Sequence, residues 1–358
     1  MKKFLAIALF SVSTSLCAQD TIRYAVLSAG KPSGQQWIIQ NAPDAYTLFY
    51  EFNDRGRGPG LTVQLKTDDK GIPVYRLVTG FDYFKAPVNE VYELKNGEAR
   101  WKSATENGTK NMTAPSLYSP INSTPAEIEW MLQAALQQKN HQIETLPSGF
   151  LQVKHIKNHT TSIDGISEEL ELYSFVGAGG PPTHAWFTPK KKFFASVSGW
   201  SGVVLKGYEN TVTELYEAQK RAEHDYFELQ ADHLVELSDK PVAFKNVTVF
   251  NSLTGKYLKD QTVIVENGLI REVGKASKIK IESTYKVIDG NGKVLMPGLW
   301  DNHAHYSTEQ GLYHLAGGVT NIKALGNSLD LPDTKKQVDR GELLGPEISI
   351  MSGFSDFA

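Results

Sequence analysis

Short strands of alternating apolar and polar residues dominate the first half of the chain, and this pattern constrains the fold more than any other feature. Residues 61–66 (LTVQLK) and 91–94 (VYEL) alternate in this way, and residues 95–98 (KNGE) are typical of a hairpin turn. Since successive side chains on a strand point to opposite faces, each such strand has one buried face and one solvent-exposed face. The pattern predicts a β-rich domain over residues 19–207, for which an open half-barrel is one form.

One helix is expected inside this β-rich region, and a second directly after it. Thr124 is a candidate N-cap, Pro125 fits the first helical position, and Glu127 completes a capping box. A single apolar stripe follows, made of Ile128, Met131, Leu132, Ala135 and Leu136. The second helical stretch, residues 212–234, carries many charges, and we interpret residues 208–240 as a helical connector.

The charge balance argues against a polyanionic partner. Lys and Arg number 37 against 40 Asp and Glu, which gives a net charge of -3 and leaves no basic excess. Because nucleic-acid binding depends on such an excess, we expect no nucleic-acid partner. No apolar run approaches the roughly 20 residues that cross a bilayer, so we also expect no membrane span.

The first 18 residues are typical of a secretory signal peptide. A Lys-Lys start, a short apolar run over residues 4–12 and the small residue Ala18 follow one another in the usual order. We expect cleavage after Ala18 and an exported protein, periplasmic or secreted. The only cysteine, Cys17, would be removed, which leaves neither a thiol nor a disulfide in the mature chain. A lipid anchor on Cys17 is the alternative, and the bulky Leu16 before it fits that processing badly.

The pattern changes after Pro241. Residues 244–250 and 285–290 are predicted strands, and residues 262–274 form a predicted hairpin around an Asn-Gly turn. These strands suggest a small, composite β-sandwich domain over residues 241–297. From residue 298 onward, predicted strands alternate with predicted helices, which is typical of βαβ units and a parallel sheet. The expected fold class is therefore α+β followed by α/β.

Two histidines at the start of this last segment form the candidate chemical site. Side chains on a strand repeat every two residues, so His303 and His305 project to one face while Ala304 points to the other. Two neutral imidazoles are half of a site for a divalent cation such as Zn²⁺. Asp301 lies on the same face of the strand. Its carboxylate could orient one of the imidazole rings by a hydrogen bond without binding the metal itself. The spacing alone does not distinguish a metal site from an incidental pair.

The surrounding residues resemble the metal-dependent amidohydrolase superfamily. Residues 292–305 (GKVLMPGLWDNHAH) resemble the entry into that family's barrel, and residues 316–323 (AGGVTNIK) resemble the second barrel strand of its imidazolonepropionase-like and prolidase-like branch. The resemblance implies a (β/α)8 barrel that holds one or two divalent metals at the C-terminal ends of its strands, and Zn²⁺ is the expected ion. It places His303 and His305 as metal ligands. It also implies hydrolysis of amide or cyclic-amide C–N bonds in small-molecule or peptide-like substrates.

The chain after residue 298 is too short for a whole barrel, which takes about 250 residues. Residues 298–358 are expected to supply only its first three strands. The family's remaining metal ligands and its Asp general base are then expected beyond Ala358, so we expect this N-terminal part to be inactive alone.

A binding or scaffold module is the alternative function. Aromatic residues cluster in the β-rich region, namely Tyr75, Phe81, Tyr83, Phe84 and Tyr92. They could line a ligand or partner surface in an open half-barrel, or they could form its core.

Overall fold

The computed structural model describes residues 21–163, 165–177, 182–325 and 330–350. The predicted signal peptide, residues 1–18, lies outside the described residues. The chain divides into two compact units, Met1–Ala222 and Glu223–Ala358. Among the described residues, no helix combines the length and the apolar character needed to cross a bilayer.

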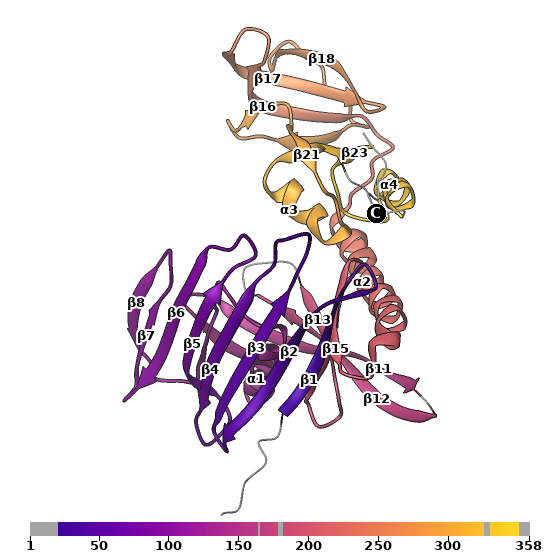
Figure 1. Cartoon of the computed structure of the whole chain (residues 1–358). Helices are drawn as coiled ribbons and strands as arrows, with labels where there is room; N and C mark the ends of the chain where they lie inside the picture. The colour runs from indigo at the N-terminus through magenta and orange to yellow at the C-terminus, as the bar shows by residue number, and fades with distance from the viewer. Residues whose placement is uncertain (1–20, 164, 178–181, 326–329, 351–358) are drawn as a thin grey trace, which may run out of the picture. The chain divides into compact units, whose positions relative to one another are not determined.

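A 15-stranded sheet forms the first unit (Figure 1). Its spatial order is β8-β7-β6-β5-β4-β3-β2-β1-β15-β14-β13-β12-β11-β10-β9, and all neighbours are antiparallel except β9 and β10. Because β8 and β9 stand at opposite ends of this order, the sheet is open. The strands are β1 (Thr21–Ser28), β2 (Lys31–Ala42), β3 (Ala45–Phe52), β4 (Gly60–Thr67), β5 (Pro73–Phe81), β6 (Pro87–Lys95), β7 (Glu98–Lys102), β8 (Asn107–Asn111), β9 (Ser116–Tyr118), β10 (Gln142–Leu146), β11 (Phe150–Ile163), β12 (Ile166–Val176), β13 (Thr183–Phe187), β14 (Phe193–Val197) and β15 (Ser201–Leu205).

The alternation read from the sequence appears directly in this sheet. Leu61, Val63 and Leu65 of β4 are buried, whereas the residues between them are partly or fully exposed. The turn between β6 and β7 has positive φ at both central residues, 52° at Asn96 and 79° at Gly97. That backbone matches the right-handed twist of the two strands it joins.

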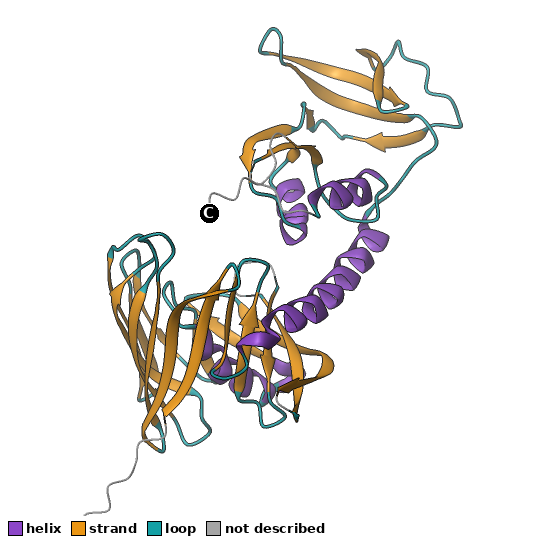
Figure 2. Cartoon of the chain, turned by 45° about the vertical axis from the view of Figure 1, so that its right-hand side comes forward, coloured by secondary structure: helices purple, strands orange, loops and turns teal. Residues whose placement is uncertain are grey.

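The helix predicted inside the β-rich region is present and supplies much of its core. It begins as a 3₁₀ turn, η1 (Pro125–Glu127), and continues as α1 (Ile128–Leu136); a second short turn, η2 (Lys139–His141), follows. The backbone N–H of Thr124 donates to Glu127 Oε1 at 2.7 Å, which is one half of the predicted capping box. Trp130 and Leu132 of α1 pack into the buried cluster of the sheet, which curves around the helix (Figure 2).

A second helix covers the opposite face of the same sheet. In β1, Tyr24 and Val26 pack into the α1 cluster, whereas Ala25 and Leu27 pack into a second cluster with Leu215. Leu215 belongs to α2 (Val212–Leu234), which has the bounds predicted for the helical stretch and follows the turn η3 (Glu209–Thr211). The boundary between the two units falls within α2.

The second unit begins with a single sheet, which differs from the predicted β-sandwich. Its order is β18-β17-β16-β19, and β20 also pairs with β16. Strand β16 pairs antiparallel with β17 on one side and parallel with β19 and β20 on the other, so all these strands join one layer. The described strands between residues 242 and 295 thus belong to one sheet and not to two. The bounds are β16 (Val242–Asn251), β17 (Lys256–Glu266), β18 (Leu269–Lys275), β19 (Lys286–Asp289) and β20 (Val294–Leu295).

The rest of the second unit is a three-stranded parallel sheet with helical connections, as the alternation of strands and helices predicted. Its order is β21-β22-β23, and Ile322 and Ile348 lie in its buried cluster. The elements are β21 (Leu299–Ala304), η4 (Thr308–Gln310), α3 (Gly311–Ala316), β22 (Val319–Ala324), α4 (Leu331–Asp339) and β23 (Glu347–Ile350). These described strands form an open sheet.

Candidate functional site

The two candidate ligands lie together at the C-terminal end of β21. His303 is in the strand and His305 follows it directly; both are exposed, and their ring centroids are 5.4 Å apart. Ala304 and Tyr306 alternate with them and are only 5% and 7% exposed. The period-two pattern therefore places both imidazoles on one accessible face and anchors the residues between and after them in the core.

Asp301 fixes the backbone of this strand end. Its Oδ1 accepts a hydrogen bond from the backbone N–H of His303 at 2.9 Å. The register between β21 and β22 also shifts between Asp301 and Ala304, as at a bulge, which can redirect a side chain. Asp301 thus positions His303 through the main chain, whereas the sequence suggested an interaction with an imidazole ring.

The donor set of the pair fits part of a zinc site. Imidazole nitrogen is a preferred zinc donor, and both rings are accessible on the same side of the strand. Catalytic zinc sites usually have three protein ligands. Over the described residues, no group of three or more His, Cys, Asp or Glu side chains includes His303 or His305.

A second group of possible metal donors lies on α2, and sequence reasoning missed it. His224, Asp225 and Glu228 offer donor atoms within 4.8 Å of one another. His224 Nδ1 lies 3.5 Å from Glu228 Oε1, and its Nε2 lies 2.9 Å from Gln337 Nε2. The i, i+4 spacing of His224 and Glu228 on a charged helix is the signal that could have found this group.

Comparison with known proteins identifies relatives for part of the chain. No family model matches it. A dihydroorotase from Bacillus cytotoxicus is 34% identical over 98 residues, covering 24% of this chain and 23% of the relative. A dihydroorotase from Bacillus thuringiensis is 32% identical over 98 residues, with the same coverage. The match thus spans about a quarter of the length of these curated relatives.

Solved structures show similarities of the same limited extent. An amidohydrolase shares 26% identity, with 32% of each chain covered and a TM-score of 0.28. An enamidase, described as a member of the amidohydrolase superfamily, shares 22% identity, with 32% of this chain and 38% of that chain covered and a TM-score of 0.25. Because both TM-scores are low, the relationship rests on the sequence matches. Over the residues that those matches cover, this chain is similar in sequence to dihydroorotases, and this similarity supports the resemblance to amidohydrolases indicated by the residues around His303 and His305.

Proposed function

We propose that the whole protein is a metal-dependent hydrolase of amide or cyclic-amide C–N bonds. The observation that carries this proposal is the pair His303 and His305, exposed side by side at the C-terminal end of a parallel strand in a chain related to amidohydrolases. The proposed substrates are small-molecule or peptide-like amides.

The proposed metal ligands are His303 and His305, and the proposed ion is Zn²⁺, which imidazole nitrogen suits well. When bound, such an ion supplies Lewis acidity to a carbonyl group and to water. The chain holds the two rings in place through buried Ala304 and Tyr306, and through the hydrogen bond from the His303 backbone to Asp301. Further ligands and a general base would have to come from other parts of the whole protein.

Zinc titration of the chain, followed residue by residue, tests the site. Labelling the histidine rings with ¹³C at Cε1 gives one NMR signal for each of the nine histidines. We expect the signals of His303 and His305 to shift first and with the same midpoint, because a shared ion binds both rings in one step. Addition of a chelator should reverse both shifts.

Two variants sharpen this titration. His303→Ala should abolish the shift of His305, whereas Glu228→Gln, which disables the donor group on α2, should leave both shifts unchanged. The metal assignment would be overturned if His224 alone responded to zinc, or if His305 responded equally in the His303→Ala protein.

We also propose that the protein is exported and that residues 1–18 are removed. The proposal rests on the Lys-Lys start, the short apolar run and the small residue Ala18. Mass spectrometry of protein from the extracytoplasmic fraction should find a chain that begins at Gln19. A mature chain that retained residues 1–18, or carried a lipid on Cys17, would contradict it.

A further inference from the structure

Tyr306 follows the candidate ligand His305 directly and is buried in the second unit. It is 7% exposed and belongs to the buried cluster of the parallel sheet, together with Ile322 and Ile348. Its ring lies 6.1 Å from the ring of His314 in α3, with an angle of 26° between the two planes. Tyr306 therefore connects the end of β21 with the helix that follows it.

Two glycines leave room for the hydroxyl end of this ring. A Cβ atom at Gly345, in the connection between α4 and β23, would lie 2.5 Å from Tyr306 Oη. A Cβ atom at Gly311, the first residue of α3, would lie 2.8 Å from the same oxygen. Both separations are too short for atoms that are not bonded, so the ring fills a socket that is open because Gly311 and Gly345 have no side chain.

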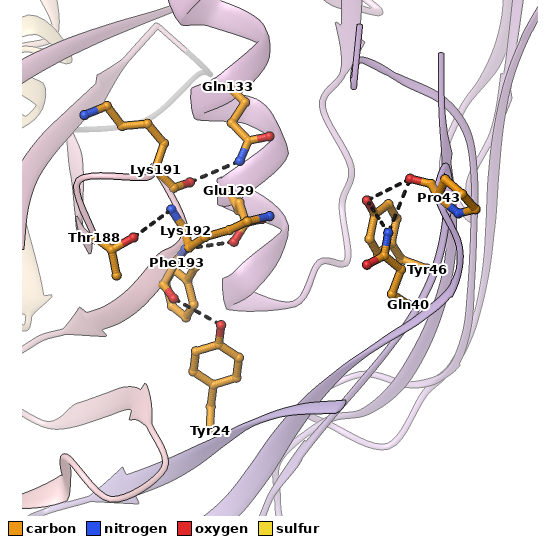
Figure 3. Close-up of polar contacts among 10 residues, drawn as sticks. All are labelled: Tyr24, Gln40, Pro43, Tyr46, Glu129, Gln133, Thr188, Lys191, Lys192 and Phe193. Atoms are coloured by element: carbon orange, nitrogen blue, oxygen red, sulfur yellow. Dashed lines mark hydrogen bonds and ion pairs between the residues drawn. The ribbon is translucent and has the colours of Figure 1, made fainter. Parts of the chain in front are cut away.

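The hydroxyl group of Tyr306 has volume in this socket but gains no hydrogen bond there. Its Oη is buried and has no hydrogen-bond partner among the described residues. Buried tyrosine hydroxyls usually have such a partner. Tyr24 in the first unit shows the usual arrangement, since its Oη donates to the carbonyl oxygen of Phe193 at 3.1 Å (Figure 3). In the part of the chain that the structure describes, Tyr306 thus acts through its shape.

The backbone of His305 is held on both sides, although its own side chain is exposed. Before it, the carbonyl oxygen of Ala304 accepts a hydrogen bond from the backbone N–H of Leu325 at 2.8 Å. After it, Tyr306 occupies the socket. Because backbone geometry sets the direction of a side chain, these two buried neighbours determine where the exposed imidazole ring points.

We propose that Tyr306 is a positioning residue for the histidine pair. By filling the socket between Gly311 and Gly345, it fixes the direction of the His305 ring relative to that of His303. The inference rests on the proposed metal site, because two donors bind one ion well only when packing holds their relative geometry.

Three variants test the contact between Gly345 and the hydroxyl group. Gly345→Ala places a methyl group against Tyr306 Oη, and Gly345 does not have the positive φ that alanine disfavours. Tyr306→Phe removes this oxygen and retains the ring. In the double variant, the atoms nearest to the new methyl group are Val338 Cγ2 at 3.2 Å and the ring Cζ at position 306 at 3.5 Å, which small shifts accommodate. Gly317→Ala, at the end of α3, is the matched control, since its methyl group meets only atoms at 3.3 Å or more.

The first measurement needs no metal. In the full chain with ¹³C-labelled histidine, the rings of His303 and His305 should show a nuclear Overhauser effect, because their centroids are 5.4 Å apart. Gly345→Ala should reduce this effect at least twofold. Tyr306→Phe, the double variant and Gly317→Ala should retain it. Rescue by the loss of one oxygen atom would not follow from a general loss of stability.

A zinc titration of the same proteins measures the consequence for the metal site. In Gly345→Ala, the zinc concentration at the midpoint of the His303 and His305 shifts should rise about tenfold, as is usual when the residues that orient a ligand are disturbed. The double variant should return to within twofold of the unmodified chain. If Gly345→Ala does not fold, as judged by circular dichroism, Tyr306→Leu, which is too short to fill the socket, should show the same two effects.

Two results overturn the positioning role. One is an undiminished Overhauser effect in the folded Gly345→Ala or Tyr306→Leu protein. The other is a double variant as strongly perturbed as Gly345→Ala, since the contact with Tyr306 Oη would then be irrelevant. If the Overhauser effects follow the expected pattern but zinc shifts neither ring in the unmodified chain, the positioning role is supported and the metal proposal is wrong.

Discussion

Replacing Glu127 by alanine should destabilise the first unit strongly, because the change leaves the buried guanidinium of Arg76 without its carboxylate partner. Glu127 Oε1 and Oε2 accept from Nη2 and Nε of Arg76, and Oε1 also accepts from the backbone N–H of Thr124. Both side chains of the pair are 5% exposed, so water cannot replace the lost carboxylate without entering the core. Breaking such a pair from one side costs about 3–5 kcal/mol.

The lower part of that range is expected here. Glu90 remains close enough to act on Arg76 and compensates part of the lost attraction. A loss of about 3 kcal/mol in a unit of this size, at roughly 2–4 °C per kcal/mol, lowers the melting temperature by about 6–12 °C. The exposed pair of Arg100 and Glu98 provides a matched control. Glu98→Ala should cost less than about 1 kcal/mol, because surface ion pairs contribute little.

Tryptophan fluorescence during thermal and urea unfolding measures this difference. Every tryptophan except Trp300 lies in the first unit, so the signal reports mainly on that unit. A double variant, Arg76→Met with Glu127→Leu, distinguishes the cost of an unpaired buried charge from the cost of lost side-chain packing. It should be less destabilised than Glu127→Ala, because no unpaired guanidinium remains. If Glu127→Ala and Glu98→Ala lowered the melting temperature equally, the reasoning from burial would be refuted.

Three further experiments, two on variants and one on the unmodified chain, test other parts of the molecule. Leu215→Ala, at a fully buried contact between α2 and the sheet, should lower the free energy of unfolding by about 2–5 kcal/mol in urea titrations. The pKa of Asp54 lies below its usual value, chiefly through a hydrogen bond from Arg55 and next through one from Tyr83. Asp54 therefore stabilises the fold above the ordinary carboxyl pKa, and that stabilisation is lost as the pH falls through the lower folded value; Tyr83→Phe should raise the pKa of Asp54 in NMR titrations. The 358-residue chain should hydrolyse no amide at a measurable rate with zinc present, since its described histidine pair offers one protein ligand fewer than a usual catalytic site; chelator-sensitive turnover would contradict this.

Local features of this protein were predictable from its sequence. The alternation in β4, the turn at Asn96 and Gly97, the helical range 212–234 and the shared face of His303 and His305 all depend on residues within a few positions of one another. Backbone periodicity and turn chemistry act at that range, so they can be read without knowing the fold. The resemblance to amidohydrolases could be recognised for the same reason, because the residues that carry it lie close together, between 292 and 323.

Pairings between distant residues required the tertiary structure. Tyr24 of β1 pairs with Leu205 of β15, and Arg76 meets Glu127 across 51 positions of sequence. The local sequence does not indicate which strand will pair with β1. Nor does it indicate which carboxylate will lie beside the buried guanidinium of Arg76. The same limit explains why a β-sandwich was expected where β16 joins its neighbours into one sheet. Strand periodicity determines which face a residue occupies, whereas packing of the whole chain determines what lies opposite that face.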